Sequence, residues 1–93
     1  MPKIYLNPKF NGSCKQFTRK DVTRKHHVYA TLLRFRNNPS HPSLHIEKLS
    51  HSNIWSIRLD QGNRLFFFWN KTKDTAIFFY IGSHDAYRTI GKK

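Results

Sequence analysis

The sequence is poor in cysteine and has no long apolar run. Its one cysteine, Cys14, cannot form a disulfide within the chain, so the fold does not depend on an oxidising compartment. Residues 1–10 contain no apolar stretch of the length of a signal peptide. No segment approaches the ~20 apolar residues of a membrane-spanning helix. We therefore expect a cytoplasmic protein without a membrane partner.

Acidic residues are scarce as well. Five Asp and Glu face 17 Lys and Arg, which gives a formal net charge of +12. A small domain needs a net charge of only about 2–8 to stay soluble, so solubility alone does not explain this excess. An excess of this size indicates an anionic partner, which could be nucleic acid, a membrane or an acidic protein. Residues 1–38 are the more basic part, with nine bases and one acid.

What the chain does contain is enough for one domain, which we place at residues 1–93. A length of 93 residues fits a single hydrophobic core. Eight Phe, four Tyr and two Trp supply large rings that can fill such a core from few positions. The six His do not form a zinc-binding set, because Pro42 breaks any helix between His41 and His45. We therefore expect no metal and no cofactor.

The first half of the chain is predicted to form a short strand and two helices. Residues 3–6 have the pattern of a strand, and Phe10, Cys14 and Phe17 share one face of a short helix. A second helix is expected after Thr18, which we assign as its N-cap, with Asp21 in its first turn. This helix should end before Pro39. Its apolar stripe consists of Val28, Tyr29, Leu32, Leu33 and Phe35, and its other face includes Arg24, Lys25 and Arg34.

From residue 44 onward the apolar pattern has a period of two, which predicts strands. Four strands are expected, over residues 44–49, 54–59, 64–69 and 75–81. Strand, helix, helix and four strands make an α+β fold, in which a helical hairpin packs on one face of an antiparallel meander and a short helical tail follows. The opposite face should carry Glu47, Arg58 and Arg64 and be open to a ligand, unless a bulge interrupts the alternation. The run from Phe66 to Trp69 is interpreted as core rather than a base-stacking surface.

The motifs of the second half resemble the RelE/ParE toxin superfamily. The similar segments are LHIEKL, NIWSIRLDQGNRLFFFW and IFFYIGSHDAY, and the order of the motifs matches the superfamily over residues 3–90. The resemblance is closest to the RelE, YoeB and YafQ branches. It implies a RelE-like fold and a toxin of a type II toxin–antitoxin system that inhibits translation.

The activity that this resemblance implies is metal-free cleavage of mRNA in the ribosomal A site. The 2′-hydroxyl attacks the neighbouring phosphate, and the 5′-oxygen leaves. Such a reaction needs a base for the hydroxyl proton, cations for the developing phosphorane and an acid for the leaving oxygen. The implied partners are the ribosome, mRNA and a small acidic antitoxin.

The resemblance also implies roles for individual residues. Arg64 and Arg58 match basic positions that contact the scissile phosphate, and a guanidinium can bind phosphate through two parallel hydrogen bonds. Glu47 matches the proposed general base of YoeB, and His84 matches a His of YafQ and would transfer a proton. Tyr87 matches loosely a C-terminal Tyr that could stack on a base. The alternatives are an ordinary hairpin charge for each Arg, an ion pair of Glu47 with Lys48 or an Arg, a capping His and a core Tyr.

For RNA-backbone binding, the candidate residues are Arg24, Lys25, Arg34 and Lys48. Two features depart from the RelE branch, because Ser56 stands where RelE has a second lysine and RelE has no counterpart of His84. YoeB and YafQ are therefore the closer models. Two other functions stay open at this point: a ParE-like inhibitor of DNA gyrase, and an inactive relative that binds only RNA or an antitoxin.

Overall fold

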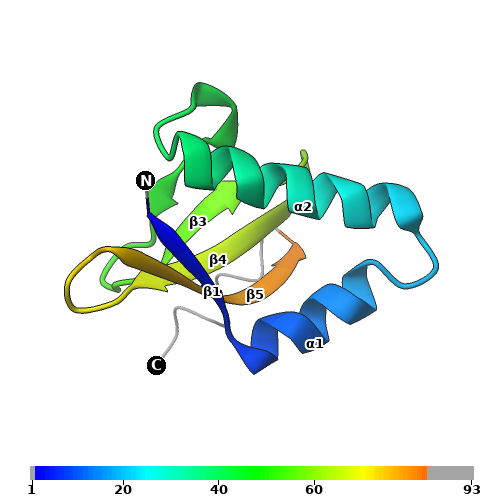
Figure 1. Cartoon of the computed structure of the whole chain (residues 1–93), viewed down its shortest axis with the longest axis horizontal. Coiled ribbons are helices and arrows are strands. Elements are labelled where there is room, and N and C mark those ends of the chain that lie inside the picture. Colours follow the sequence, from blue (N-terminus) through cyan, green and yellow to red (C-terminus); the bar gives the residue numbers. More distant parts are fainter. Residues whose placement is uncertain (1, 84–93) are drawn as a thin grey trace.

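The computed structural model describes residues 2–83, and within them it confirms the expected order of one strand, two helices and four strands. The elements are β1 (Lys3–Leu6), α1 (Pro8–Phe17), α2 (Val22–Asn37), the 3-10 helix η1 (Pro42–Leu44), β2 (Glu47–Lys48), β3 (Trp55–Arg58), β4 (Asn63–Trp69) and β5 (Thr75–Ser83). Both helices cover the same face of the sheet (Figure 1). The α+β class is therefore confirmed, while the expected helical tail falls outside the described residues.

The five strands form one mixed sheet in the order β1-β5-β4-β3-β2. Strands β2 to β5 make the expected antiparallel meander, in which each strand pairs with the next. Strand β1 joins the sheet beside β5 and runs parallel to it, with Ile4 opposite Ala76. Parallel neighbours need a long connection, and here the two helices and strands β2 to β4 lie between β1 and β5 in the sequence.

The core is centred on three phenylalanine rings between α2 and the sheet. The Phe35 ring lies 5.1 Å from the Phe67 ring and 5.6 Å from the Phe78 ring, and the last two are 4.9 Å apart, centroid to centroid. All three side chains are fully buried. Because Phe67 is on β4 and Phe78 on β5, this cluster fixes α2 against the two central strands.

The start of α2 corrects one sequence prediction. Thr18, which we expected to cap α2, instead ends α1, where its backbone N–H and its hydroxyl both donate to the Cys14 carbonyl. The N-cap of α2 is Asp21, whose carboxylate accepts a hydrogen bond of 2.9 Å from the Arg24 N–H. A carboxylate satisfies the free N–H groups at a helix start and interacts favourably with the positive end of the helix dipole, so it is the better cap here.

The strand expected over residues 44–49 is shorter than predicted. Only Glu47 and Lys48 pair with β3, and Pro42–Leu44 form the 3-10 helix η1. Proline suits the first position of a helix, because its φ angle is fixed and it has no N–H to satisfy. The buried Leu44 side chain anchors this turn to the core, and His45 then reverses the chain in a left-handed conformation at φ 43°.

A β-bulge interrupts the pairing of β4 with β5. Phe66 pairs with Tyr80 but Phe67 pairs with Phe78, so Phe79 is the extra residue on β5. The bulge changes which side chains of β5 face the helices, because Phe78 and Ile81 are both buried in the core although they are three residues apart. It leaves the pairing of β2, β3 and the first half of β4 intact.

The Phe35 cluster predicts a large difference between two positions of α2. We expect Phe35→Ala to lower the free energy of unfolding by about 3–5 kcal/mol, because it removes a fully buried ring and leaves a cavity. Leu33→Ala, at a side chain that is 54% exposed on the same helix, should change it by less than about 0.5 kcal/mol. Urea unfolding followed by circular dichroism measures both values. Equal losses for the two variants would contradict the packing described here.

Candidate active site

Three of the predicted catalytic residues share the face of the sheet that points away from the helices. Glu47 on β2 pairs directly with Ser56 on β3, and Arg58 on β3 pairs directly with Arg64 on β4. Residues that pair directly across two strands point to the same face, and so do residues two apart on one strand. The structure therefore brings Glu47, Arg58 and Arg64 together, because the bulge lies beyond Arg64.

Arg64 and Glu47 form an ion pair that spans the strand between them. The Arg64 Nη1 lies 3.5 Å from the Glu47 Oε1. Since β3 separates β2 from β4, the two backbones are about 10 Å apart, which is twice the usual spacing of strands. Ser56 lies on β3 on the same face and is small and fully buried, which leaves room for the long Arg64 side chain above it. Of the two partners offered by the sequence, Glu47 thus uses an Arg and not Lys48.

The exposure of the two charged groups differs. The Arg64 side chain is 12% exposed, whereas that of Glu47 is 54% exposed. The Arg64 side chain is therefore mostly buried, and its guanidinium faces the Glu47 carboxylate. Glu47 can meet a ligand from solvent without any rearrangement of the sheet.

Arg58 adds a second guanidinium beside the first. Two like charges directly opposite each other on neighbouring strands destabilise a sheet. Within residues 2–83, the buried Nε of Arg58 has no hydrogen-bond partner. With one carboxylate for two guanidinium groups, the cluster of Glu47, Arg58 and Arg64 has a net charge of +1, which suits an anion with several oxygen acceptors, such as a phosphate.

Lys48 is not part of this cluster. It follows Glu47 on β2 and pairs with Trp55, whose side chain packs against the core, so it points to the other face of the sheet. His84 and Tyr87 lie outside the described residues, and their roles stay predictions. The described chain ends at Ser83, which pairs with Asn63, the residue before Arg64.

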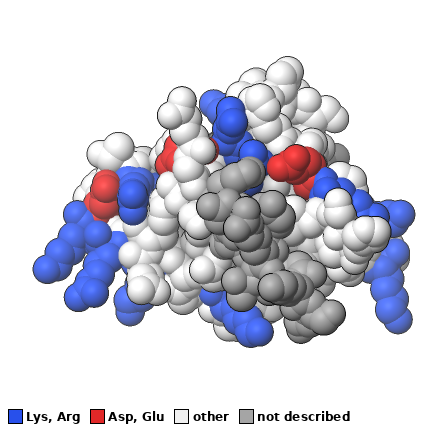
Figure 2. Space-filling model, turned by 180° about the vertical axis from the view of Figure 1, so that it is seen from behind, with Lys and Arg blue, Asp and Glu red and all other residues white. Residues whose placement is uncertain are grey.

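The basic residues of α2 are exposed, but two of them already have partners. Arg24 forms an ion pair of 3.8 Å with Asp21 and lies 4.3 Å above the centre of the Phe17 ring. Arg34 donates a hydrogen bond of 3.3 Å to the Ser43 hydroxyl. Arg24 therefore supports the turn between the helices, a role that the sequence analysis did not assign to it. Basic side chains also outnumber acidic ones on the side of the molecule seen in Figure 2.

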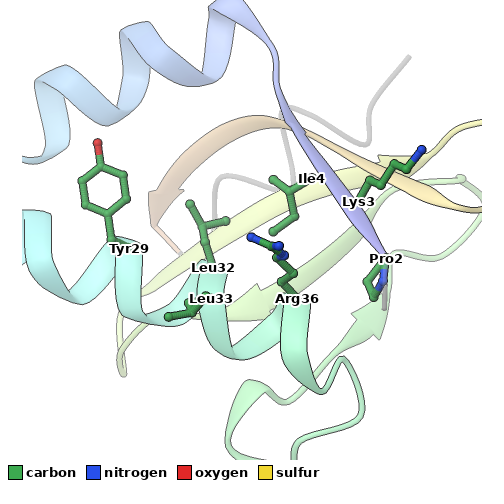
Figure 3. Close-up of a pocket in the computed structure, with 7 residues that line it drawn as sticks. All are labelled: Pro2, Lys3, Ile4, Tyr29, Leu32, Leu33 and Arg36. Atoms are coloured by element: carbon green, nitrogen blue, oxygen red, sulfur yellow. The ribbon is translucent and has the colours of Figure 1, made fainter.

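An apolar groove lies on the other side of the molecule, between β1 and α2. Its volume is about 480 Å³, and Figure 3 shows the seven residues that line it: Pro2, Lys3, Ile4, Tyr29, Leu32, Leu33 and Arg36. Tyr29 and Leu33 are more than half exposed. Among the described strands, β1 pairs only with β5, so one edge of β1 has free backbone groups beside the groove.

A second, smaller groove of about 230 Å³ continues from the first, because Tyr29 and Leu32 line both. It lies between α1 and α2 and contains Cys14 and Lys25. Burial raises the pKa of the Cys14 thiol, and the nearby positive charge of Lys25 opposes this shift only in part. The thiol is therefore not an activated nucleophile.

Two further candidate features are absent from the part of the chain that the structure describes. No three His, Cys, Asp or Glu side chains come together there in a way that could hold a metal ion. No helix within residues 2–83 has the length and hydropathy needed to cross a membrane.

Known proteins resemble this chain in fold rather than in sequence. No family model matches it, and no curated protein sequence matches it significantly. The YoeB/ParE toxin from Agrobacterium tumefaciens superposes with a TM-score of 0.72 at 13% identity, over 88% of this chain and 98% of that one. YafQ from E. coli strain BL21(DE3) gives 0.67 at 14% identity, over 92% and 97%.

A third similar structure contains a partner protein. It is the heterotetrameric YoeB–YefM toxin–antitoxin complex from Staphylococcus aureus, with a TM-score of 0.68 at 17% identity, over 90% of this chain and 98% of that one. The matches cover nearly the whole of both chains, and they include YoeB and YafQ, two of the three branches indicated by the sequence motifs. The chain therefore has the fold of the RelE/YoeB toxin superfamily, as the motifs in its sequence predicted.

Proposed function

We propose that this protein is the toxin of a toxin–antitoxin pair and that it cleaves mRNA on the ribosome. The observation that carries the proposal is the cluster of Glu47, Arg58 and Arg64 on the face of the sheet away from the helices. It combines an accessible carboxylate with two guanidinium groups, one of which is fixed by that carboxylate. The fold supports the toxin role, because similar solved structures include a YoeB/ParE toxin and a YoeB–YefM toxin–antitoxin complex.

In the proposed reaction, the two guanidinium groups bind the scissile phosphate. The Glu47 carboxylate accepts the proton of the neighbouring 2′-hydroxyl, whose oxygen then attacks the phosphorus. Arg58 and Arg64 stabilise the extra negative charge of the phosphorane, and the bond to the 5′-oxygen breaks. A proton from His84 completes the leaving hydroxyl. The products are a 2′,3′-cyclic phosphate and a 5′-hydroxyl, and no metal takes part.

The antitoxin is proposed to bind the grooves along α2 and the free edge of β1. An extended segment can add a strand to such an edge, and an amphipathic helix can fill an apolar groove. Lys3 and Arg36 border the larger groove, and Lys15 and Lys25 line the smaller one, so the fitting partner is acidic with apolar anchors. A chain that folds on binding would suit both grooves.

The cluster makes a direct prediction for RNA cleavage. We expect Arg64→Ala, Glu47→Gln and His84→Ala each to reduce cleavage at least ~100-fold, because each removes a positioned charge or proton-transfer group. Lys71→Ala, in the exposed turn before β5, is the matched control and should cleave like the wild type. Mapping of mRNA 5′ ends in a translating extract, with and without ribosomes, gives the rates. Wild-type cleavage by any of the three variants would remove that residue from the mechanism.

The basic face of α2 is expected to bind the backbone of ribosomal RNA. Binding should therefore weaken steeply with salt, because each phosphate contact releases a counterion. Lys25→Glu should lower ribosome affinity more than Arg24→Glu, since Arg24 is already held by Asp21 and Phe17. Sedimentation with ribosomes at several salt concentrations measures both effects. An affinity that does not change between low and moderate salt would contradict the assignment.

The groove along α2 leads to a prediction about the antitoxin. Leu33→Asp should prevent co-purification of an acidic companion from native host cells and should leave cleavage unchanged, because it puts a charge into the apolar groove. Val22→Asp is the matched control, since Val22 is 67% exposed at the start of the same helix and lines neither groove. Retention of the companion by both variants would place the antitoxin elsewhere. An active wild-type chain purified without any acidic companion would count against the toxin assignment.

A further inference from the structure

One exposed aromatic side chain, that of Tyr80, lies on the same face as the cluster of Glu47, Arg58 and Arg64. Tyr80 on β5 pairs directly with Phe66 on β4, and Gly82, two residues further along β5, pairs directly with Arg64. Tyr80 is therefore the diagonal neighbour of Arg64 across β4 and β5, on the same face of the sheet. The sequence analysis did not single it out, because the run from residue 77 to 81 is apolar and aromatic throughout.

The bulge at Phe79 is the reason that Tyr80 faces this way. Ala76 and Phe78 point into the core, and regular alternation would place residue 80 in the core as well. The extra residue shifts the alternation by one, so Ile81 takes the core position and Tyr80 points to the open face. A bulge that redirects a side chain next to a candidate active site is typical of a functional feature.

Gly82 determines where the Tyr80 ring lies. A Cβ atom at Gly82 would be 2.6 Å from the ring atom Cε2 and 3.2 Å from Cζ. The ring therefore lies over the backbone of Gly82 and points toward the position opposite Arg64. Any side chain at residue 82 would occupy the space that the ring now fills.

The Tyr80 ring is supported on one side and accessible to solvent. The centroid of the Phe66 ring lies 6.1 Å from that of Tyr80, and Phe66 is fully buried. Tyr80 itself is 37% exposed. A ring held by a buried neighbour and a glycine, with part of its surface free, has the properties of a stacking platform for an unpaired base.

We propose that Tyr80 stacks on the base of a nucleotide next to the phosphate that Arg58 and Arg64 bind. This inference rests on the proposed RNA cleavage at the same cluster and names a contact that orients its substrate. Stacking accepts any base, because every base has a π face. Tyr80 would thus hold the nucleotide in place beside Arg64 while the phosphate contacts position the reacting atoms.

The test measures affinity for ribosomes programmed with an mRNA that cannot be cut, because the attacking nucleotide lacks its 2′-hydroxyl. Tyr80→Ala should weaken binding about 5- to 150-fold, which is the range for stacking of one base. Tyr80→Phe keeps the ring and should bind like the wild type. Tyr5→Ala is the matched control, since Tyr5 is an exposed tyrosine on β1, at the sheet edge opposite to β2.

A second set of mRNAs, with an abasic nucleotide at each of the three codon positions in turn, tests whether the lost contact is with a base. At one position, removal of the base should weaken wild-type binding and leave Tyr80→Ala binding unchanged, because the contact is already gone. Gly82→Ala should reproduce the loss by displacing the ring, and it should have no further effect in a Tyr80→Ala background. Equal effects of Tyr80→Ala on intact and abasic mRNAs, or no effect at all, would overturn the inference.

The outcome also separates this inference from the proposed function. If the wild type cleaves ordinary mRNA but Tyr80→Ala shows no coupling to any base, only the stacking contact is wrong. If the wild type binds but never cleaves, and the coupling is present, the cleavage assignment is wrong and the base contact stands. A wild-type chain that does not bind the programmed ribosome would overturn both.

Discussion

The alternation of side chains along β4 is the constraint on which the rest of the structure depends. Within seven residues, this strand buries side chains against the helices and places Arg64 on the opposite face. Leu65 and Phe67 point into the core, while Arg64 and the buried Phe66 point to the face away from the helices. A slip of one residue would turn the Arg64 guanidinium toward the phenylalanine rings of the core, so the register is strongly determined. The core and the candidate active site are therefore two consequences of one strand pairing.

The helices contribute to the site indirectly. Because the Phe35 ring packs against Phe67 and Phe78, α2 holds β4 and β5 in a fixed relation. That relation sets the position of the bulge, and the bulge sets the direction of Tyr80. The helices lie on the other side of the sheet from the candidate active site, yet they help to determine its geometry.

The sequence predicted the fold better than the details of the site. The expected alternation placed Glu47, Arg58 and Arg64 on one face, and the observed pairing of β2, β3 and β4 confirms this placement. Other features could not be read from one sequence. The parallel pairing of β1 depends on where the chain returns after the helices. The bulge lies in an aromatic run in which every residue could face either side, so no pattern shows which residue is extra.

Strand β5 links the first strand of the described chain to the meander, and this order has a consequence for folding during synthesis. Strand β1 is made early, but its only strand partner among the described residues begins at Thr75. Strand β1 and helix α1 cannot pack against β5 until β5 itself has left the ribosome. Tyr80 lies on β5 itself, so it reaches its place as the diagonal neighbour of Arg64 only when β5 has been made. A nascent chain that ends before Thr75 would therefore lack both the strand partner of β1 and the Tyr80 ring.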